Sequence, residues 1–199
     1  MPYRLIDRVL MTRVGGRVER CHTIPHPAGY SVAAHSWGVA LLMHHLWPED
    51  FPRLGLYCLV HDVPEGWIGD IPSSVLGVLP RAQAEREALE NLLHMALRLP
   101  SPNDLPPADQ QKIDICDRLE LFLWCKEQLA CGNEMVRELH NQLHTHLFEV
   151  QHPPQVAFLL DHLDRIQSPL GRQHGVLVEL LNSKEEAKCV EKEDGWRME

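Results

Sequence analysis

A short polar stretch in the first third of the chain carries residue types suited to metal chemistry. Residues 54–73 read LGLYCLVHDVPEGWIGDIPS, in which His61 and Asp62 are adjacent and are followed by Glu65 and Asp70. A proline and a glycine follow the apolar helical run, so we expect these side chains at a helix end and in the loop after it. An imidazole nitrogen beside a carboxylate oxygen suits a divalent cation such as Zn, Mn, Co or Fe.

A metal site needs at least two more ligands, and two other predicted helices offer them. His35 lies in the first turn of a helix that can pack antiparallel to the one ending at His61. Asp114 and Asp117 lie one turn apart on a long, partly apolar helix. A carboxylate in such surroundings costs free energy unless it is paired or ligated. One of these two aspartates is therefore a candidate for the fourth ligand.

The elements that must position these residues are all helical. No period-two strand pattern and no internal repeat is visible, so we predict an all-α architecture. The first helix carries Leu5, Ile6, Val9 and Leu10 on one face, and Gly15 and Gly16 terminate it. We expect helices over residues 3–13, 32–47, 54–60, 81–99, 107–131, 134–149 and 154–166.

Length and composition favour one domain and exclude several classes of protein. The chain has 199 residues, of which 44% are hydrophobic, enough for a single core. We assign residues 1–183 to this domain and the charge-rich residues 184–199 to a flexible tail. The net charge of −9 argues against binding a nucleic-acid polymer, which needs a basic surface. A small anionic substrate is compatible with this charge if a metal and a few arginines supply local positive charge.

Cysteine usage and hydropathy place the protein inside the cell. The six cysteines form no CxxC pair, and several lie within apolar helical patterns, so we expect reduced thiols. No apolar run approaches 18 residues and no signal peptide opens the chain, so we expect no membrane association. Together these features predict a cytoplasmic protein.

The candidate ligands form a recognisable order along the chain. His35, then His61 and Asp62 about 26 residues later, then an aspartate in a further helix give the pattern H…HD…D. This pattern resembles the HD-domain metal-dependent phosphohydrolases. It resembles more closely the branch that holds bacterial 5′-deoxynucleotidases of the YfbR type and phage dATP triphosphohydrolases of the DatZ type. The resemblance covers residues 4–150 and rests on an arginine fifteen positions before the first histidine and on three segments: AAHSWGVALL, LVHDVPEGWIGDIPSSV and IDICDRLELFLWCKEQLACGN.

This resemblance implies an HD-domain helical bundle around a divalent metal, with Zn, Co or Mn as the ion and Mg as an additional one. It implies His35, His61, Asp62 and Asp117 as the ligands. Asp117 is chosen over Asp114 because it lies at the matching distance before the CGN turn.

The resemblance also implies roles for the residues around the metal. Glu65 matches the acidic residue that assists water or the leaving group. Asp70 matches one that holds the sugar 3′-hydroxyl, and Arg20 matches an arginine on the phosphate. Cys21 stands where the nucleotidases carry a tryptophan that packs on the sugar. The family often has a lysine on the phosphate after the GD-P turn, and here Arg81 or Arg86 is the candidate.

Several functions remain open at this stage. We favour cleavage of the 5′ phosphoester of 2′-deoxynucleotides, as a dATP or dNTP triphosphohydrolase. The alternative is a 5′-deoxynucleotidase that acts on dNMPs. Another HD activity, on cyclic or alarmone nucleotides, is disfavoured by the GDIP turn. From a different class, the chain could be an inactive HD module that binds nucleotide. The resemblance also suggests a homo-oligomer, a dimer or a hexamer.

Overall fold

The computed structural model describes residues 4–27, 29–71 and 80–166, and it confirms the all-α prediction. Among these residues there is no strand, and one isolated antiparallel bridge joins Glu19 to Ser31. The predicted boundary between residues 183 and 184, with the tail that follows it, lies outside the described residues. The helices are α1 (Leu5–Gly15), α2 (Val32–Leu46), α3 (Phe51–Val60), α4 (Glu65–Ile68), α6 (Pro80–Leu97), α7 (Pro107–Ala130), α8 (Arg137–Phe148) and α9 (Pro154–Arg165), with short 3-10 turns at Pro102–Asp104 and Glu134–Val136.

Local signals in the sequence explain where the central helices begin and end. The Ser31 hydroxyl accepts a hydrogen bond from the backbone N–H of Ala34 and so caps the start of α2. The far end of α7 is closed by Gly132, whose φ of 84° lies in the left-handed region that glycine adopts without strain. These two helices, with α3, carry the residues singled out above.

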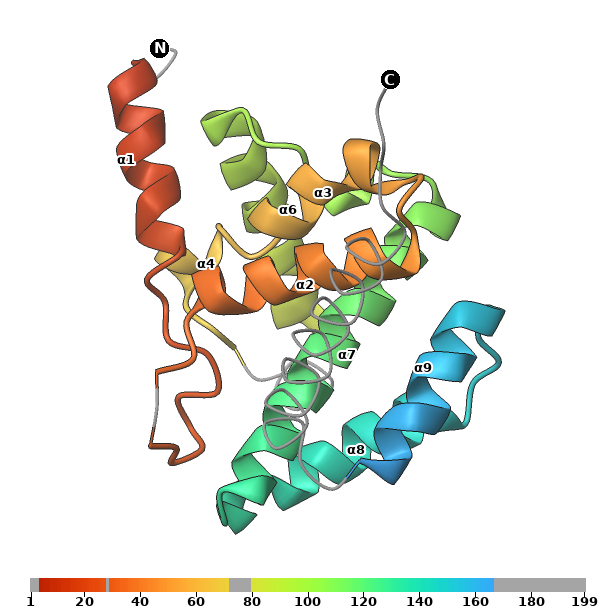
Figure 1. Cartoon of the computed structure of the whole chain (residues 1–199). Helices are drawn as coiled ribbons and strands as arrows, with labels where there is room; N and C mark the ends of the chain where they lie inside the picture. The colour runs from red at the N-terminus through yellow and green to blue at the C-terminus, as the bar shows by residue number, and fades with distance from the viewer. Residues whose placement is uncertain (1–3, 28, 72–79, 167–199) are drawn as a thin grey trace, which may run out of the picture.

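Helix α2 packs against both α3 and α7 and so forms the middle of the molecule, while α8 packs on α7 toward one end (Figure 1). The main hydrophobic core lies along these contacts. Its largest fully buried apolar side chains include Phe122, Met43, Leu54, Leu119, Leu147, Val39, Val136 and Val156. Because three helices of this core each end or pass near one point, their polar residues can converge there.

The turn that follows α3 differs from the prediction in one respect. We expected Pro64 and Gly66 to leave Glu65 in a loop, but Pro64 is the N-cap of the short helix α4, and Glu65 is its first residue. Proline is compatible with a helix start because the first N–H groups of a helix have no partner within it. The segment from His61 to Glu65 is therefore a tight helix-to-helix connection.

Helix α1 lies at the edge of the molecule (Figure 1) and contacts α4 and α6. Its last residue, Gly15, is buried against the turn after α3, where a Cβ would overlap the carbonyl oxygen of Val63. The apolar face of this helix is largely exposed. The exposed fractions are 70% for Leu5, 57% for Ile6, 47% for Val9 and 54% for Leu10. The periodicity predicted the helix, but the face has no partner among the described residues that covers it.

Within the described ranges, none of the helices combines the length and the hydropathy that a membrane crossing requires.

Candidate metal centre

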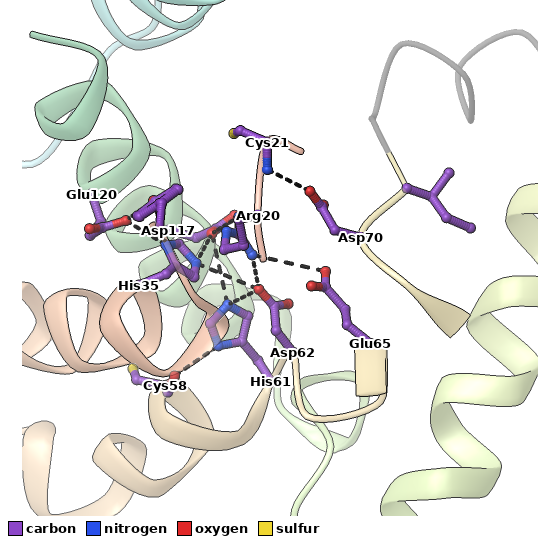
Figure 2. A network of polar contacts seen from close by, with 12 residues as sticks. Arg20, Cys21, His35, Cys58, His61, Asp62, Glu65, Asp70, Asp117 and Glu120 are labelled. Atoms are coloured by element: carbon purple, nitrogen blue, oxygen red, sulfur yellow. Dashed lines mark hydrogen bonds and ion pairs between the residues drawn. The ribbon is translucent and has the colours of Figure 1, made fainter. Parts of the chain in front are cut away.

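Four of the predicted residues come together from three helices. His35 lies in the first turn of α2, His61 caps the end of α3 with Asp62 directly after it, and Asp117 lies midway along α7. One ligand atom from each residue lies within 4.8 Å of the others, and Figure 2 shows the side chains pointing toward one another. Asp114, the alternative fourth ligand, is half-exposed and pairs with an arginine on its own helix. The structure thus brings Asp117, and not Asp114, into the cluster.

The atoms that face the centre have the character of metal ligands. His35 Nε2 lies 2.8 Å from Asp117 Oδ1 and 3.6 Å from Asp62 Oδ2. His61 Nε2 lies 3.3 Å from Asp62 Oδ2 and 3.8 Å from Asp117 Oδ1. Both Nε2 atoms are buried, and neither has a hydrogen-bond partner among the described residues. Two buried imidazole nitrogens that have no hydrogen-bond partner among the described residues, together with two carboxylates, fit a divalent cation such as Zn²⁺.

The opposite nitrogen of each imidazole is held by an acceptor. His61 Nδ1 lies 2.8 Å from the carbonyl oxygen of Cys58, and His35 Nδ1 lies 2.5 Å from Glu120 Oε2. A carbonyl and a carboxylate only accept hydrogen bonds, so each Nδ1 carries the proton and donates it. In the neutral ring the lone pair is then on Nε2, which faces the cluster. This is the tautomer that a metal-ligating histidine needs.

Electrostatics within the cluster reflect its crowded carboxylates. Burial alone would lower the pKa of His61, but the nearby carboxylates of Asp62 and Asp117 outweigh it and raise that pKa to about 9. Burial would raise the pKa of Asp117, yet its contacts with His35 and His61 hold it well below the usual range. Without a cation the negative charge is thus balanced in part by protons on the imidazoles. A divalent ion would take over that role and release those protons.

Arg20 supplies a permanent positive charge at the same point. It lies in the loop between α1 and α2, is 9% exposed, and donates to Asp62 through Nη1. The other carboxylates near it are 3.9 Å away, from Nη1 to Glu65 Oε1 and from Nη2 to Asp117 Oδ1. Although burial opposes it, the carboxylates raise the pKa of Arg20. Its Nε is buried and has no hydrogen-bond partner within the described part of the chain, so this N–H is an unsatisfied donor that an anion could accept from.

Glu65 lies on the other side of Arg20, at the start of α4 (Figure 2). It is 4% exposed, and its Oε2 has no hydrogen-bond partner among the described residues. Burial and the negative charge of Asp62 raise the pKa of Glu65 to about 8, against the opposing effect of Arg20. A carboxyl in this state holds a proton near neutral pH and can donate it.

Asp70 and Cys21 are linked to each other. The Cys21 backbone N–H donates to Asp70 Oδ2 over 2.7 Å, and His22 Nδ1 lies 3.6 Å from the same oxygen. Cys21 has a φ of 53°, which is uncommon for a residue other than glycine. Asp70 therefore fixes the loop that carries Arg20. Burial raises the pKa of the Cys21 thiol to about 11, so the sulfur is not a nucleophile at neutral pH.

The two arginines considered for a phosphate contact lie in different places. Arg86 Nη2 is 3.6 Å from Glu65 Oε1, and the side chain is mostly buried. Arg81 is 93% exposed and pairs with Glu85 one turn along α6. The structure places Arg86, rather than Arg81, beside Glu65.

Two residues of this site were missed from the sequence. Glu120 faces His35, and the Tyr30 hydroxyl donates to the same carboxylate. The spacing from Asp117 was the available signal for Glu120, since residues three apart share a helix face. Tyr30 lies in the irregular segment before α2 and gave no such signal.

Comparisons with known proteins agree with this geometry. A family model described as HD domain matches residues 17–120, a range that contains the four clustered residues, Arg20 and Glu65. A comparison with curated protein sequences gives no match. Several solved structures match the fold, including the following two. The PH0347 protein from Pyrococcus horikoshii OT3 matches with a TM-score of 0.60 and 20% identity, covering 81% of this chain and 98% of that one. The cyanophage S-2L HD phosphohydrolase DatZ, bound to dA and one catalytic Zn²⁺ ion, matches with a TM-score of 0.51 and 18% identity, covering 77% of this chain and 94% of that one.

Proposed function

The chain belongs to the HD-domain family, and on that premise we propose that it is a metal-dependent phosphohydrolase acting on 2′-deoxynucleotides. The observation that carries the proposal is the cluster of His35, His61, Asp62 and Asp117, in which two buried Nε2 atoms have no hydrogen-bond partner within the described ranges. We assign these four residues as the metal ligands. When bound, a divalent cation lowers the pKa of a coordinated water and polarises phosphoryl oxygens.

The residues around the cluster supply the remaining chemistry. The unused Nε donor of Arg20 supports a role in binding a phosphoryl oxygen, where its positive charge stabilises the charge that develops during attack. Water attacks the phosphorus next to the deoxyribose, and the bond from that phosphorus to the 5′-oxygen breaks. Glu65 gives its proton to the leaving 5′-oxygen, which its burial and the nearby charge of Asp62 support because both raise the pKa of its carboxyl.

Two loop residues, Asp70 and Cys21, and one similar solved structure support the proposed class of substrate. We assign Asp70, with Cys21 beside it, to the sugar, because Oδ2 holds the loop that carries Arg20 and a carboxylate can accept a further hydrogen bond from a hydroxyl. The structural neighbour bound to dA supports a deoxyadenosine-type ligand. We favour dNTPs over dNMPs because Arg86 adds a second guanidinium beside Glu65 that further phosphates can contact. The products are then a deoxynucleoside and triphosphate.

The test is a panel of dNTPs, dNMPs and NTPs, assayed on metal-stripped protein to which Zn²⁺, Co²⁺, Mn²⁺ or Mg²⁺ is returned. Released phosphate, pyrophosphate and triphosphate are separated and quantified. We expect triphosphate and deoxyadenosine from dATP and no release in the presence of a chelator.

Two other outcomes separate the alternatives. Orthophosphate from dNMPs, with no product from dNTPs, identifies a 5′-deoxynucleotidase that uses the same bond cleavage. No release from any nucleotide with any metal contradicts the enzyme and favours a nucleotide-binding module.

A further inference from the structure

We propose that Glu120 is a positioning residue that, together with Tyr30, fixes the orientation and tautomer of His35 for metal binding. This inference rests on the proposed metal centre and adds a residue that the sequence pattern H…HD…D does not include. Glu120 contacts His35 at Nδ1, the ring nitrogen opposite the one that faces the cluster. It acts through His35, whose side chain is completely buried between α2 and α7.

The hydrogen bonds around Glu120 leave one consistent placement of protons. Glu120 Oε2 lies 2.5 Å from His35 Nδ1 and also accepts from the Tyr30 hydroxyl, which itself lies 3.1 Å from Nδ1. An ionised carboxylate cannot donate, so Nδ1 must carry a proton toward it. The Tyr30 hydroxyl then points its proton at Glu120 as well, because Nδ1 has no lone pair to accept it. His35 Nε2 is left as the ligand atom.

The surrounding structure holds Glu120 in this place. The ring of Tyr30 stacks on Trp124, one turn after Glu120 on α7, with the ring centroids 4.6 Å apart. On α2, one turn after His35, Gly38 gives the Glu120 side chain room, since a Cβ there would lie 2.6 Å from Glu120 Cγ. Two helices and the preceding loop thus converge on one carboxylate.

The two histidines of the cluster are therefore supported in different ways. His61 donates to a backbone carbonyl of its own helix, which is a neutral acceptor fixed by helix geometry. His35 donates to a charged side chain from another helix, so its orientation depends on one replaceable residue. A carboxylate acceptor also makes the imidazole a stronger electron donor to a metal than a carbonyl does. Loss of Glu120 should weaken metal binding through His35 and leave the support of His61 unchanged.

The experiment is a Co²⁺ titration of the metal-stripped full-length protein, with affinity measured against a competing chelator and the visible absorption bands recorded. The variants are Glu120→Ala and Glu120→Gln. Glu127→Gln is the matched control, since it removes the same charge on the same helix away from His35. We expect Glu120→Ala to weaken Co²⁺ binding by about 10- to 100-fold and to shift the bands. Glu120→Gln keeps an acceptor for Nδ1–H, so we expect it to restore part of the affinity and the wild-type bands.

A second variant reaches the same carboxylate by another route. Gly38→Ala removes no polar group but displaces the Glu120 side chain, so we expect weaker Co²⁺ binding and a band shift in the same direction. Thermal unfolding in the presence of chelator identifies variants that fail to fold. If Glu120→Ala fails to fold, the Co²⁺ affinities of Glu120→Gln and Gly38→Ala test the proposal in its place.

The outcomes distinguish this inference from the proposed function. Wild-type affinity and unchanged bands in the folded Glu120 variants overturn the positioning role while the metal centre stands. Absence of Co²⁺ binding by the wild-type protein overturns the metal centre and this inference together. Equal losses in Glu127→Gln and Glu120→Gln overturn it too, because a general effect of charge would then explain both.

Discussion

The metal centre and helix α1 reverse the usual placement of polar and apolar side chains. At the centre, His35 is completely buried and Glu65 is 4% exposed, whereas on α1 the side chains of Leu5 and Ile6 are 70% and 57% exposed. Burying polar groups costs free energy unless each finds a partner, and at the centre most of them do. Among the buried atoms without a hydrogen-bond partner in the described residues are the two Nε2 atoms of His35 and His61, which are the nitrogens that a cation would bind. The difference shows that an apolar stripe on a helix does not ensure that the stripe is covered. It also shows that polar side chains can be buried where hydrogen-bond or ion-pair partners surround them.

The largest effect that this comparison predicts is at Asp117. We expect Asp117→Ala to abolish nucleotide hydrolysis and to weaken metal binding by more than about 100-fold. This exceeds the loss that is typical when a residue that only holds a metal ligand in place is removed. The matched change is Asp114→Ala, three residues earlier on the same helix, which should spare both properties because that side chain faces solvent. Turnover and bound metal per chain measure the two effects. Equal losses from both variants would show that the helix register at the centre is wrong.

The next effect separates chemistry from metal binding. Glu65→Gln keeps the shape of the side chain but cannot give up a proton to a leaving group. We expect turnover to fall by about 10²- to 10⁴-fold. Because Glu65 is not an assigned ligand, bound metal per chain should stay at the wild-type value. Unchanged turnover would remove the role that we assign to Glu65 while leaving the metal centre intact.

A pair of leucine substitutions compares the two regions by stability. Leu119 lies between Asp117 and Glu120 in the sequence of α7 and is fully buried. Leu119→Ala should lower the free energy of unfolding by about 2–5 kcal/mol. Leu10 is 54% exposed, and Leu10→Ala should change the free energy of unfolding by less than about 0.5 kcal/mol. Denaturant unfolding measures both. A comparable loss at Leu10 would mean that the exposed face of α1 is covered in solution, which would support the predicted homo-oligomer.

The smallest effect concerns the pH dependence of stability in the metal-free protein. The pKa of Glu65 rises from 4.5 to about 8 on folding, so the folded state binds a proton more tightly than the unfolded chain. Stability from this group is complete below about pH 4.5 and is lost as the pH rises to about 8. In chelator, the melting temperature of the wild-type protein should therefore fall across this window.

Glu65→Gln is the control for that titration. Its fall in melting temperature should be shallower. A slope remains because the raised pKa values of His35 and His61 act in the same direction. Identical slopes for the two proteins would show that Glu65 does not titrate in this range.

Much of the fold was predictable from the sequence, and the reasons can be given residue by residue. Apolar periodicity predicted the central helices, and the all-α class is confirmed. Pro64 was interpreted only as a helix breaker, although proline also begins helices, so α4 was missed. The exposure of Leu10 was not predictable because periodicity contains no information about the neighbour that a face will meet.

The candidate site also contains residues that could be predicted from the sequence and residues that could not. Convergence of the residues at the H…HD…D positions followed from the resemblance, and their role as ligands stays a prediction. Glu120 was overlooked because an acidic residue on a long helix is equally typical of a solvated face. Arg81 and Arg86 could not be separated, since their orientation depends on where α6 lies relative to α4. Tertiary contacts determine which of these side chains faces the site, and a single sequence does not specify those contacts.

The most direct test of the account is anomalous X-ray diffraction at the zinc absorption edge from crystals of the protein grown with Zn²⁺. The account predicts one strong peak per chain, about 2.0–2.2 Å from His35 Nε2, His61 Nε2 and one carboxylate oxygen each of Asp62 and Asp117. No peak among these four side chains, or a peak bound by other residues, would contradict it.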